Sequence, residues 1–183
     1  VHLKASLLNK MPGDYWQKFA QARLFAAYMM THPGKKLTFM GEEIGQFREW
    51  DYEGEIEWFL LEYESHAKFQ RYVAELNHFY LSQPALWQID GSWDGFKWIN
   101  ASDNENSVLS YIRKGKKSKD DIIVVANFTP VDRPVYTLGV PKSGEYEVII
   151  HSNSTEFGGN RLIGAKKYTA RKEKYSDMDY SID

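Results

Sequence analysis

Residues 107–128 read SVLSYIRKGKKSKDDIIVVANF, two runs rich in β-branched and aromatic residues on either side of a polar, lysine-rich stretch. Such runs are typical of β-strands, and the Gly115 region between them is a turn signal. Working outward, we expect strands at 96–100, 107–113, 122–128, 135–138 and 146–151, separated by turn signals such as Lys142-Ser143-Gly144. Strands at this spacing predict an antiparallel sandwich.

The first half of the chain has a helical pattern instead. Asp14 is placed to cap a helix, with Gln17 in the capping-box position and apolar residues at helical spacing as far as Tyr28. This helix should end before Pro33-Gly34. The apolar run 36–40 then predicts a short buried strand, and a second helix is expected at 66–82, whereas 1–12 is expected to be a loop.

These patterns predict an α+β chain with a domain boundary near residue 90. Residues 1–90 would hold a helix-strand-helix portion, and residues 91–183 an antiparallel all-β sandwich. The irregular segment 41–65 between the strand and the second helix carries nine Asp or Glu residues, with Arg48 as its one basic residue. Long loops of this kind inside compact domains are usually functional.

Composition narrows the classes of function. The chain has 183 residues, a net charge of −2 and a pI of about 6.2, so nothing in its charge attracts a nucleic acid. It has no cysteine, which excludes disulfides and thiolate metal sites and fits a cytoplasmic location. We expect no membrane partner, because no apolar run is long enough to cross a bilayer. The chain begins at Val1 without an initiator Met, so we expect the natural amino terminus to lie upstream.

Three stretches resemble the glycogen (1,4-α-glucan) branching enzymes of the α-amylase family. They are SLLNKMPGDYWQKFA at 6–20, PGKKLTFMGEEIGQ at 33–46 with Arg48-Glu49-Trp50 after it, and ANFTP at 126–130. The resemblance runs in order from residue 1 to about residue 160. The chain departs from the family where Glu42 replaces a usual Asn and Leu3 a usual Gly.

The resemblance implies an architecture and an activity. Residues 1–90 would be the last part of a (β/α)8 barrel, with 36–40 as its eighth strand, and the all-β domain would follow. The whole enzyme would cleave an α-1,4-glucan and transfer the segment to a sugar 6-hydroxyl, which forms an α-1,6 branch of glycogen. A branching enzyme of this kind needs no cofactor.

The resemblance also implies that the catalytic residues are not in this chain. A retaining reaction of this type needs a carboxylate nucleophile and a carboxylic acid about 5–5.5 Å apart. The family's nucleophile and acid/base follow barrel strands four and five, and its third Asp precedes a Val-Val-His run that would end at Val1-His2. We therefore assign no catalytic residue here and expect the isolated chain to be inactive.

What remains for this chain is substrate binding. The loop after the eighth strand and the segment after the seventh would face the glucan cleft, because barrel active sites lie at the carboxyl ends of the strands. The candidate substrate-binding residues are Glu43, Gln46, Arg48, Glu49, Trp50, His2 and Lys4. The alternative is that these side chains only hold the loop to the barrel. The acidic residues of the loop are more simply interpreted as a solvated face: Glu42, Glu43, Glu49, Asp51, Glu53, Glu55 and Glu57. We expect no calcium site, because their spacing matches no EF-hand.

Other interpretations stay open. The β domain could be a noncatalytic carbohydrate-binding or purely structural module, with Trp93, Phe96 and Trp98 either stacking on sugar or packing between domains. The chain could also belong to a related debranching enzyme. By the resemblance, a last apolar strand should follow Tyr180-Ser181-Ile182, so we expect that strand to be missing. With a bare sheet edge and an uncovered strand at 36–40, the chain is expected to self-associate.

Overall fold

The computed structural model describes residues 4–162 and 166–183. Its contacts divide the chain into two compact units. The helical unit comprises residues 1–82 and 151–163, and the β unit comprises residues 83–150 and 164–183. This division differs from the expected boundary near residue 90, because residues 83–90 group with the strands and residues 151–163 with the helices.

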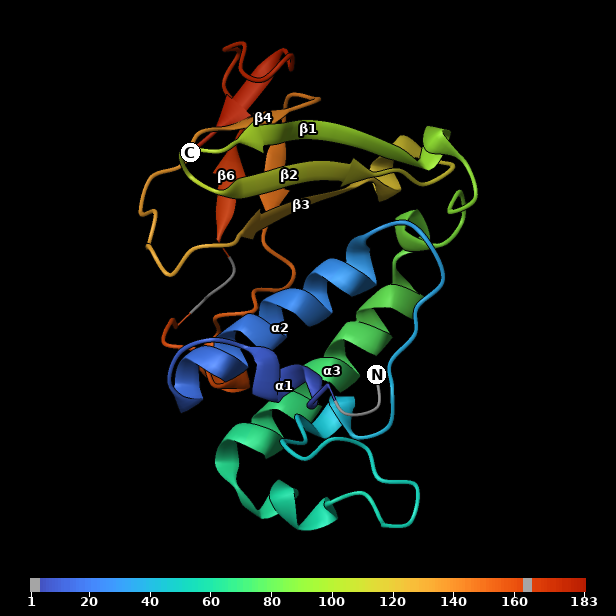
Figure 1. Cartoon of the computed structure of the whole chain (residues 1–183). Coiled ribbons are helices and arrows are strands. Elements are labelled where there is room, and N and C mark those ends of the chain that lie inside the picture. Colours follow the sequence, from blue (N-terminus) through green and yellow to red (C-terminus); the bar gives the residue numbers. More distant parts are fainter. Residues whose placement is uncertain (1–3, 163–165) are drawn as a thin grey trace. The chain divides into compact units, whose positions relative to one another are not determined.

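Three helices form the frame of the helical unit: α1 (Leu7–Lys10), α2 (Tyr15–Thr31) and α3 (Glu64–Ser82). The long helices α2 and α3 pack against each other (Figure 1). The expectation that 1–12 is entirely a loop was wrong, because Ser6 Oγ accepts the Asn9 backbone N–H at 3.1 Å and starts the one-turn helix α1. The 3₁₀ turns of the unit are η1 (Glu42–Ile44), η2 (Trp58–Glu62) and η6 (Thr155–Phe157).

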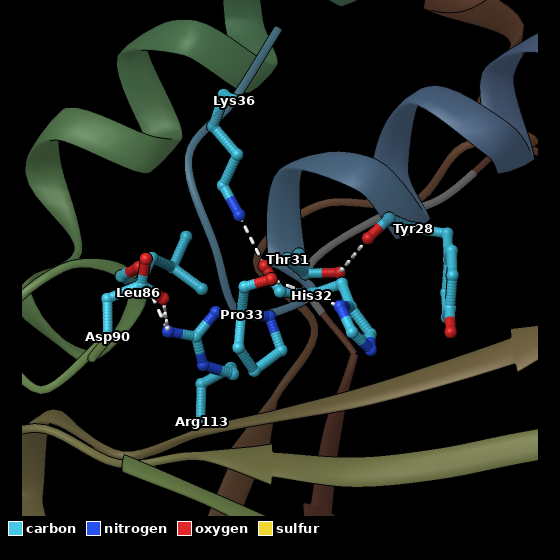
Figure 2. Close-up of polar contacts among 8 residues, drawn as sticks. All are labelled: Tyr28, Thr31, His32, Pro33, Lys36, Leu86, Asp90 and Arg113. Carbon is cyan, nitrogen blue, oxygen red and sulfur yellow. Dashed lines mark hydrogen bonds and ion pairs between the residues drawn. The ribbon is translucent and has the colours of Figure 1, made fainter. Parts of the chain in front are cut away.

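Both ends of α2 lie where the sequence predicts them. Asp14 accepts the backbone N–H of Gln17 at 2.8 Å, and the Gln17 side chain accepts the Asp14 N–H at 2.8 Å, which completes the capping box. At the other end, the Lys36 ammonium donates to the carbonyl of His32, immediately after the last helical residue (Figure 2). A cation at this end also complements the helix dipole.

The predicted strand at 36–40 was wrong. These residues form no β-ladder, and Leu37, Phe39 and Met40 are 83%, 42% and 56% exposed. A strand needs a neighbour to satisfy its backbone groups, and none of the described strands pairs with this segment. The Phe39 N–H donates instead to Glu42 Oε2, at 2.9 Å.

The segment 151–163 is attached to the helices by specific contacts. Trp16 Nε1 donates to the Gly158 carbonyl at 2.9 Å, and Arg23 Nε donates to the Ser152 carbonyl at 2.7 Å. The ring centroids of Tyr72 and Phe157, both buried, lie 4.9 Å apart. A buried apolar cluster completes the unit, formed by Leu8, Phe19, Ala22 and Phe69.

The β unit contains one three-stranded antiparallel sheet in the order β1 (Phe96–Asp103), β2 (Val108–Arg113) and β3 (Ile122–Asn127) (Figure 1). Two antiparallel pairs accompany it: β4 (Leu138–Val140) with β7 (Tyr180–Ile182), and β5 (Glu145–Glu147) with β6 (Lys167–Thr169). The predicted antiparallel sandwich is confirmed by the core, which joins residues of two sheets: Ile99, Ile112, Leu138, Val140 and Met178. Short 3₁₀ turns are η3 (Pro84–Leu86), η4 (Trp93–Gly95) and η5 (Ser118–Asp120).

The first three predicted strands are confirmed, with small differences at their ends. The strand expected at 135–138 begins only at Leu138, and the one expected at 146–151 ends at Glu147. Strands β6 and β7 were missed. Each has three residues, too few for an alternation pattern to appear in the sequence.

A buried ion pair explains why residues 83–90 belong to the β unit. Arg113 on β2 has no exposed side-chain surface, and its Nη2 donates to Asp90 Oδ1 at 2.7 Å and to the Leu86 carbonyl at 3.0 Å (Figure 2). A guanidinium taken out of water needs such partners. The pair therefore ties the segment after α3 to the three-stranded sheet.

Candidate functional site

The loop after residue 40 is organised around Gln46. Its side chain is 6% exposed; Nε2 donates to the Arg48 carbonyl at 3.2 Å, and Oε1 accepts the Glu57 N–H at 3.2 Å. Gly41 has a φ of +82°, and a Cβ there would lie 2.8 Å from Gln46 Oε1. The Gln46 side chain thus holds the loop together and has little capacity left for a ligand.

A second segment joins this loop through two hydrogen bonds. The Ala5 backbone N–H donates to Glu49 Oε2 at 3.0 Å, and Ser6 Oγ donates to the Phe47 carbonyl at 2.9 Å. Residues 5 and 6, next to the candidate Lys4, are therefore joined to the loop that carries Glu49, more than 40 residues further along the chain. Lys4 is exposed beside this junction, whereas His2 lies outside the described residues.

The exposed part of the loop carries aromatic rings. Trp50 is 39% exposed, and its ring lies edge-to-face with Phe39 at a centroid distance of 5.3 Å. Tyr52 is 72% exposed, and its ring centroid lies 6.4 Å from that of Trp50. Phe39 and Tyr52 were not among the predicted site residues, because Phe39 was interpreted as part of a buried strand. Three rings together offer a wider apolar surface than Trp50 alone.

The charged candidates differ in their availability. Arg48 is exposed and forms an ion pair with Asp51 at 2.7 Å, which holds the guanidinium at the surface. Glu43 lies on η1 and is half-buried. Glu49 is also half-buried. Its Oε1 is buried, and its Oε2 accepts the backbone N–H of Ala5.

A buried histidine, to which the sequence analysis assigned no role, contacts the start of the loop. His66 on α3 is 2% exposed, and its Nδ1 lies 2.7 Å from the Ile44 carbonyl. Because a carbonyl only accepts, Nδ1 carries the proton and donates. The imidazole also lies edge-to-face with Phe19 at 4.9 Å. His66 thus fixes the η1 turn to the helical unit.

The exposed side chains of this loop are suited to binding hydroxyl groups and the apolar faces of rings. Carboxylate, guanidinium and ammonium groups can bond hydroxyls, and aromatic rings can stack on the C–H face of a sugar. In residues 4–162 and 166–183, no group of His, Asp and Glu is arranged to hold a metal ion. Across the same residues, no helix combines the length and hydropathy needed to cross a membrane.

The β unit holds the other aromatic candidates. Phe96 is only 8% exposed and belongs to the core, with its ring centroid 4.8 Å from that of Trp98. Trp93 is 83% exposed, and Trp98 is 38% exposed. Of the three rings considered as a sugar platform, Trp93 is therefore the most accessible.

Comparison with known proteins shows which enzymes this chain is similar to. Residues 98–183 match the model of the α-amylase C-terminal all-β domain. The whole chain is 46% identical to the 1,4-alpha-glucan branching enzyme GlgB of Halothermothrix orenii and 49% identical to that of Clostridium perfringens. The corresponding enzyme of Aquifex aeolicus is 50% identical over 91% of the chain.

The match covers only part of each relative. The chain spans 29%, 28% and 27% of the lengths of these three enzymes. The matched domain model names the carboxy-terminal all-β domain, which fits the sandwich formed by β1 to β7. Over its whole length, the chain therefore corresponds to the carboxy-terminal part of the 1,4-α-glucan branching enzymes.

Proposed function

We propose that this chain is the carboxy-terminal part of an enzyme that cleaves α-1,4-glucan and transfers the cut segment to a 6-hydroxyl, which makes the α-1,6 branches of glycogen. The relatives that match across the whole chain carry this activity in their names. In this proposal, the helical unit completes a (β/α)8 barrel, and the β unit forms the all-β domain. The enzyme acts in the cytoplasm.

The role of this chain within the enzyme is glucan binding by the loop from Glu43 to Trp50. The observation that supports this most strongly is the junction of Ala5 with Glu49, because it unites both segments expected at the cleft. Trp50, with Phe39 and Tyr52 beside it, provides the stacking surface. Arg48, Glu43 and Lys4 provide hydrogen bonds at its rim, and Gln46 holds the loop.

The test is Trp50→Ala in a complete branching enzyme that carries this chain. Stacking on an aromatic side chain contributes about 0.5–1.5 kcal/mol, so KM for amylose should rise about two- to twelvefold. Tyr63→Ala, which removes an exposed ring elsewhere in the helical unit, is the control. An unchanged KM for Trp50→Ala would remove the loop from the substrate site.

The isolated chain should neither branch nor hydrolyse glucan. Positioning groups alone do not replace a nucleophile and a general acid. Iodine staining of amylose, after incubation with the purified chain, measures this. A robust activity that disappears on mutation of an acidic residue of the chain would overturn the proposal that the reaction's carboxylates lie elsewhere.

A second candidate function is noncatalytic binding of α-glucan by the β unit. The observation that favours it is the exposure of Trp93, whose indole face is accessible for stacking on a sugar. Retention of the chain on immobilised glycogen tests it. Trp93→Ala should then lose retention, whereas Val135→Ala, which changes another exposed apolar residue of the same unit, should keep it.

A further inference from the structure

We infer that Glu49 is a positioning residue, which fixes the segment before α1 at the glucan site through the backbone of Ala5. This inference rests on the proposed function of the loop, because it concerns how the Lys4 segment is held there. Of the two alternatives that the sequence leaves open for Glu49, it sides with a structural role over direct contact with the sugar.

The first observation is the conformation of Ala5. Its φ is +61°, in the left-handed region, which an L-residue other than glycine seldom adopts. Such a conformation persists when the surroundings hold it in place. Here the Ala5 N–H donates to Glu49 Oε2 at 3.0 Å, and the next residue is held by the bond from Ser6 Oγ to the Phe47 carbonyl.

The second observation concerns the other oxygen of Glu49. Glu49 Oε1 is buried, and it has no hydrogen-bond partner among residues 4–162 and 166–183. Because Oε1 is buried, a sugar in solvent cannot form a hydrogen bond with it. The accessible chemistry at this junction therefore belongs to the segment that Glu49 holds, including the exposed Lys4.

The third observation is the rigidity of the support. Glu49 follows Arg48, whose carbonyl accepts Gln46 Nε2, and Gln46 is itself buried and bonded to Glu57. His66 holds the start of the same loop at Ile44. A carboxylate on so well anchored a loop can impose its geometry on the segment that it contacts.

Two substitutions of Glu49 distinguish the effect of where its acceptor oxygen lies from the effect of its charge. Glu49→Gln keeps an oxygen at the same distance but removes the charge. Glu49→Asp keeps the charge but withdraws the oxygen by one methylene. If Glu49 positions Ala5, Gln should resemble the wild type and Asp should be impaired. If Glu49 binds sugar through its charge, the order should reverse.

The first measurement is amide hydrogen exchange of Ala5, followed by NMR in the full chain without glucan. Loss of a hydrogen bond to a charged acceptor should speed exchange about tenfold in Glu49→Asp, with Glu49→Gln within about threefold of the wild type. Equal exchange rates in all three proteins would overturn the inference, whatever the chain binds.

The second measurement is the kinetics of a complete branching enzyme that carries this chain. Glu49→Asp should raise KM for amylose about fivefold with kcat within about twofold, and Glu49→Gln should leave both near the wild type. Glu64→Ala, which removes a Glu paired with Lys68 on α3, is the control for a change of charge in the same unit.

Together, the two measurements distinguish a failure of the positioning role of Glu49 from a failure of the proposed glucan site. If Ala5 exchange responds as expected but neither the Glu49 nor the Trp50 variants change KM, the glucan role of the loop is wrong, and so is the positioning role that depends on it. If KM rises in Glu49→Gln as much as in Glu49→Asp, the carboxylate charge acts on substrate directly, and the positioning role fails while the glucan site stands.

Discussion

Asp103, at the end of β1, illustrates at the scale of one residue how a turn is held. Its carboxylate accepts the Asn106 side-chain N–H at 2.9 Å and the Tyr136 hydroxyl at 2.8 Å. Removal from water acts to raise the pKa of Asp103, but the bonds from Asn106 and Tyr136 and the charge of Arg133 outweigh it and lower the pKa. Burial and the bond to Asp103 raise the pKa of Tyr136 in turn.

Asp103→Asn should therefore destabilise the β unit in a pH-dependent way. A carboxyl whose pKa is depressed by folding adds stability above its unfolded pKa, near 3.9, and loses it as pH falls through the folded pKa. The wild type should exceed the variant by about 1 kcal/mol at pH 7, and this difference should shrink below about pH 4. Urea unfolding at both pH values measures it.

The control for this prediction is Tyr136→Phe. It removes one donor to Asp103 but leaves the carboxylate, so the pH dependence should persist in weaker form. A difference between wild type and Asp103→Asn that is the same at neutral and acid pH would contradict the role given to the charge.

At the residue scale, the sequence alone does not decide what each polar side chain of the loop at 41–65 does. For Gln46 and Glu49 the sequence leaves sugar binding and loop support as alternatives, and in the structure each bonds backbone groups of the protein. His66 received no role and is a buried support. A polar side chain in a loop can bond either a ligand or the loop itself, and only the path of the backbone decides between them.

At the scale of elements, the helix start was predicted from residues of its own turn, whereas the segment 36–40 shows the limit of a strand prediction. The capping box fixed the start of α2 because Asp14 and Gln17 act on their own turn. The run 36–40 has the composition of a strand, but a strand also depends on a neighbour that its own sequence does not contain. Strands β6 and β7 were missed for another reason, because three residues are too few to show alternation.

Amide exchange should show this difference between elements. Strand β2 is paired on both sides, with β1 and with β3, whereas residues 36–40 form no ladder. The amides of 109–112 should therefore exchange at least about a thousandfold more slowly than those of 37–40. Mass spectrometry of the deuterated chain resolves the two segments, and similar protection in both would contradict the structure given to 36–40.

At the scale of the whole molecule, we predict self-association of the chain through an apolar surface on the helical unit. This 37–52 surface consists of Leu37, Phe39, Met40, Trp50 and Tyr52, each at least 39% exposed. Exposed apolar groups this large favour contact with another molecule. Light scattering over a range of concentrations should show association, which the double variant Leu37→Lys/Met40→Lys abolishes.

Leu162→Lys is the matched control, because Leu162 is 89% exposed in the same unit but is not part of the 37–52 surface. It should associate as the wild type does. If the wild type stays monomeric at every concentration, the surface is covered within the molecule and the prediction is wrong.

The placement of residues 151–163 has a consequence for how this region can be exchanged between proteins. A single gene crossover at residue 83 would transfer the strands together with Phe157 and Gly158, and so separate them from Tyr72 and Trp16. The recipient would have to supply matching helices. We therefore expect that the β unit can be exchanged only together with α2 and α3, and that successful chimaeras have their junctions upstream of α1.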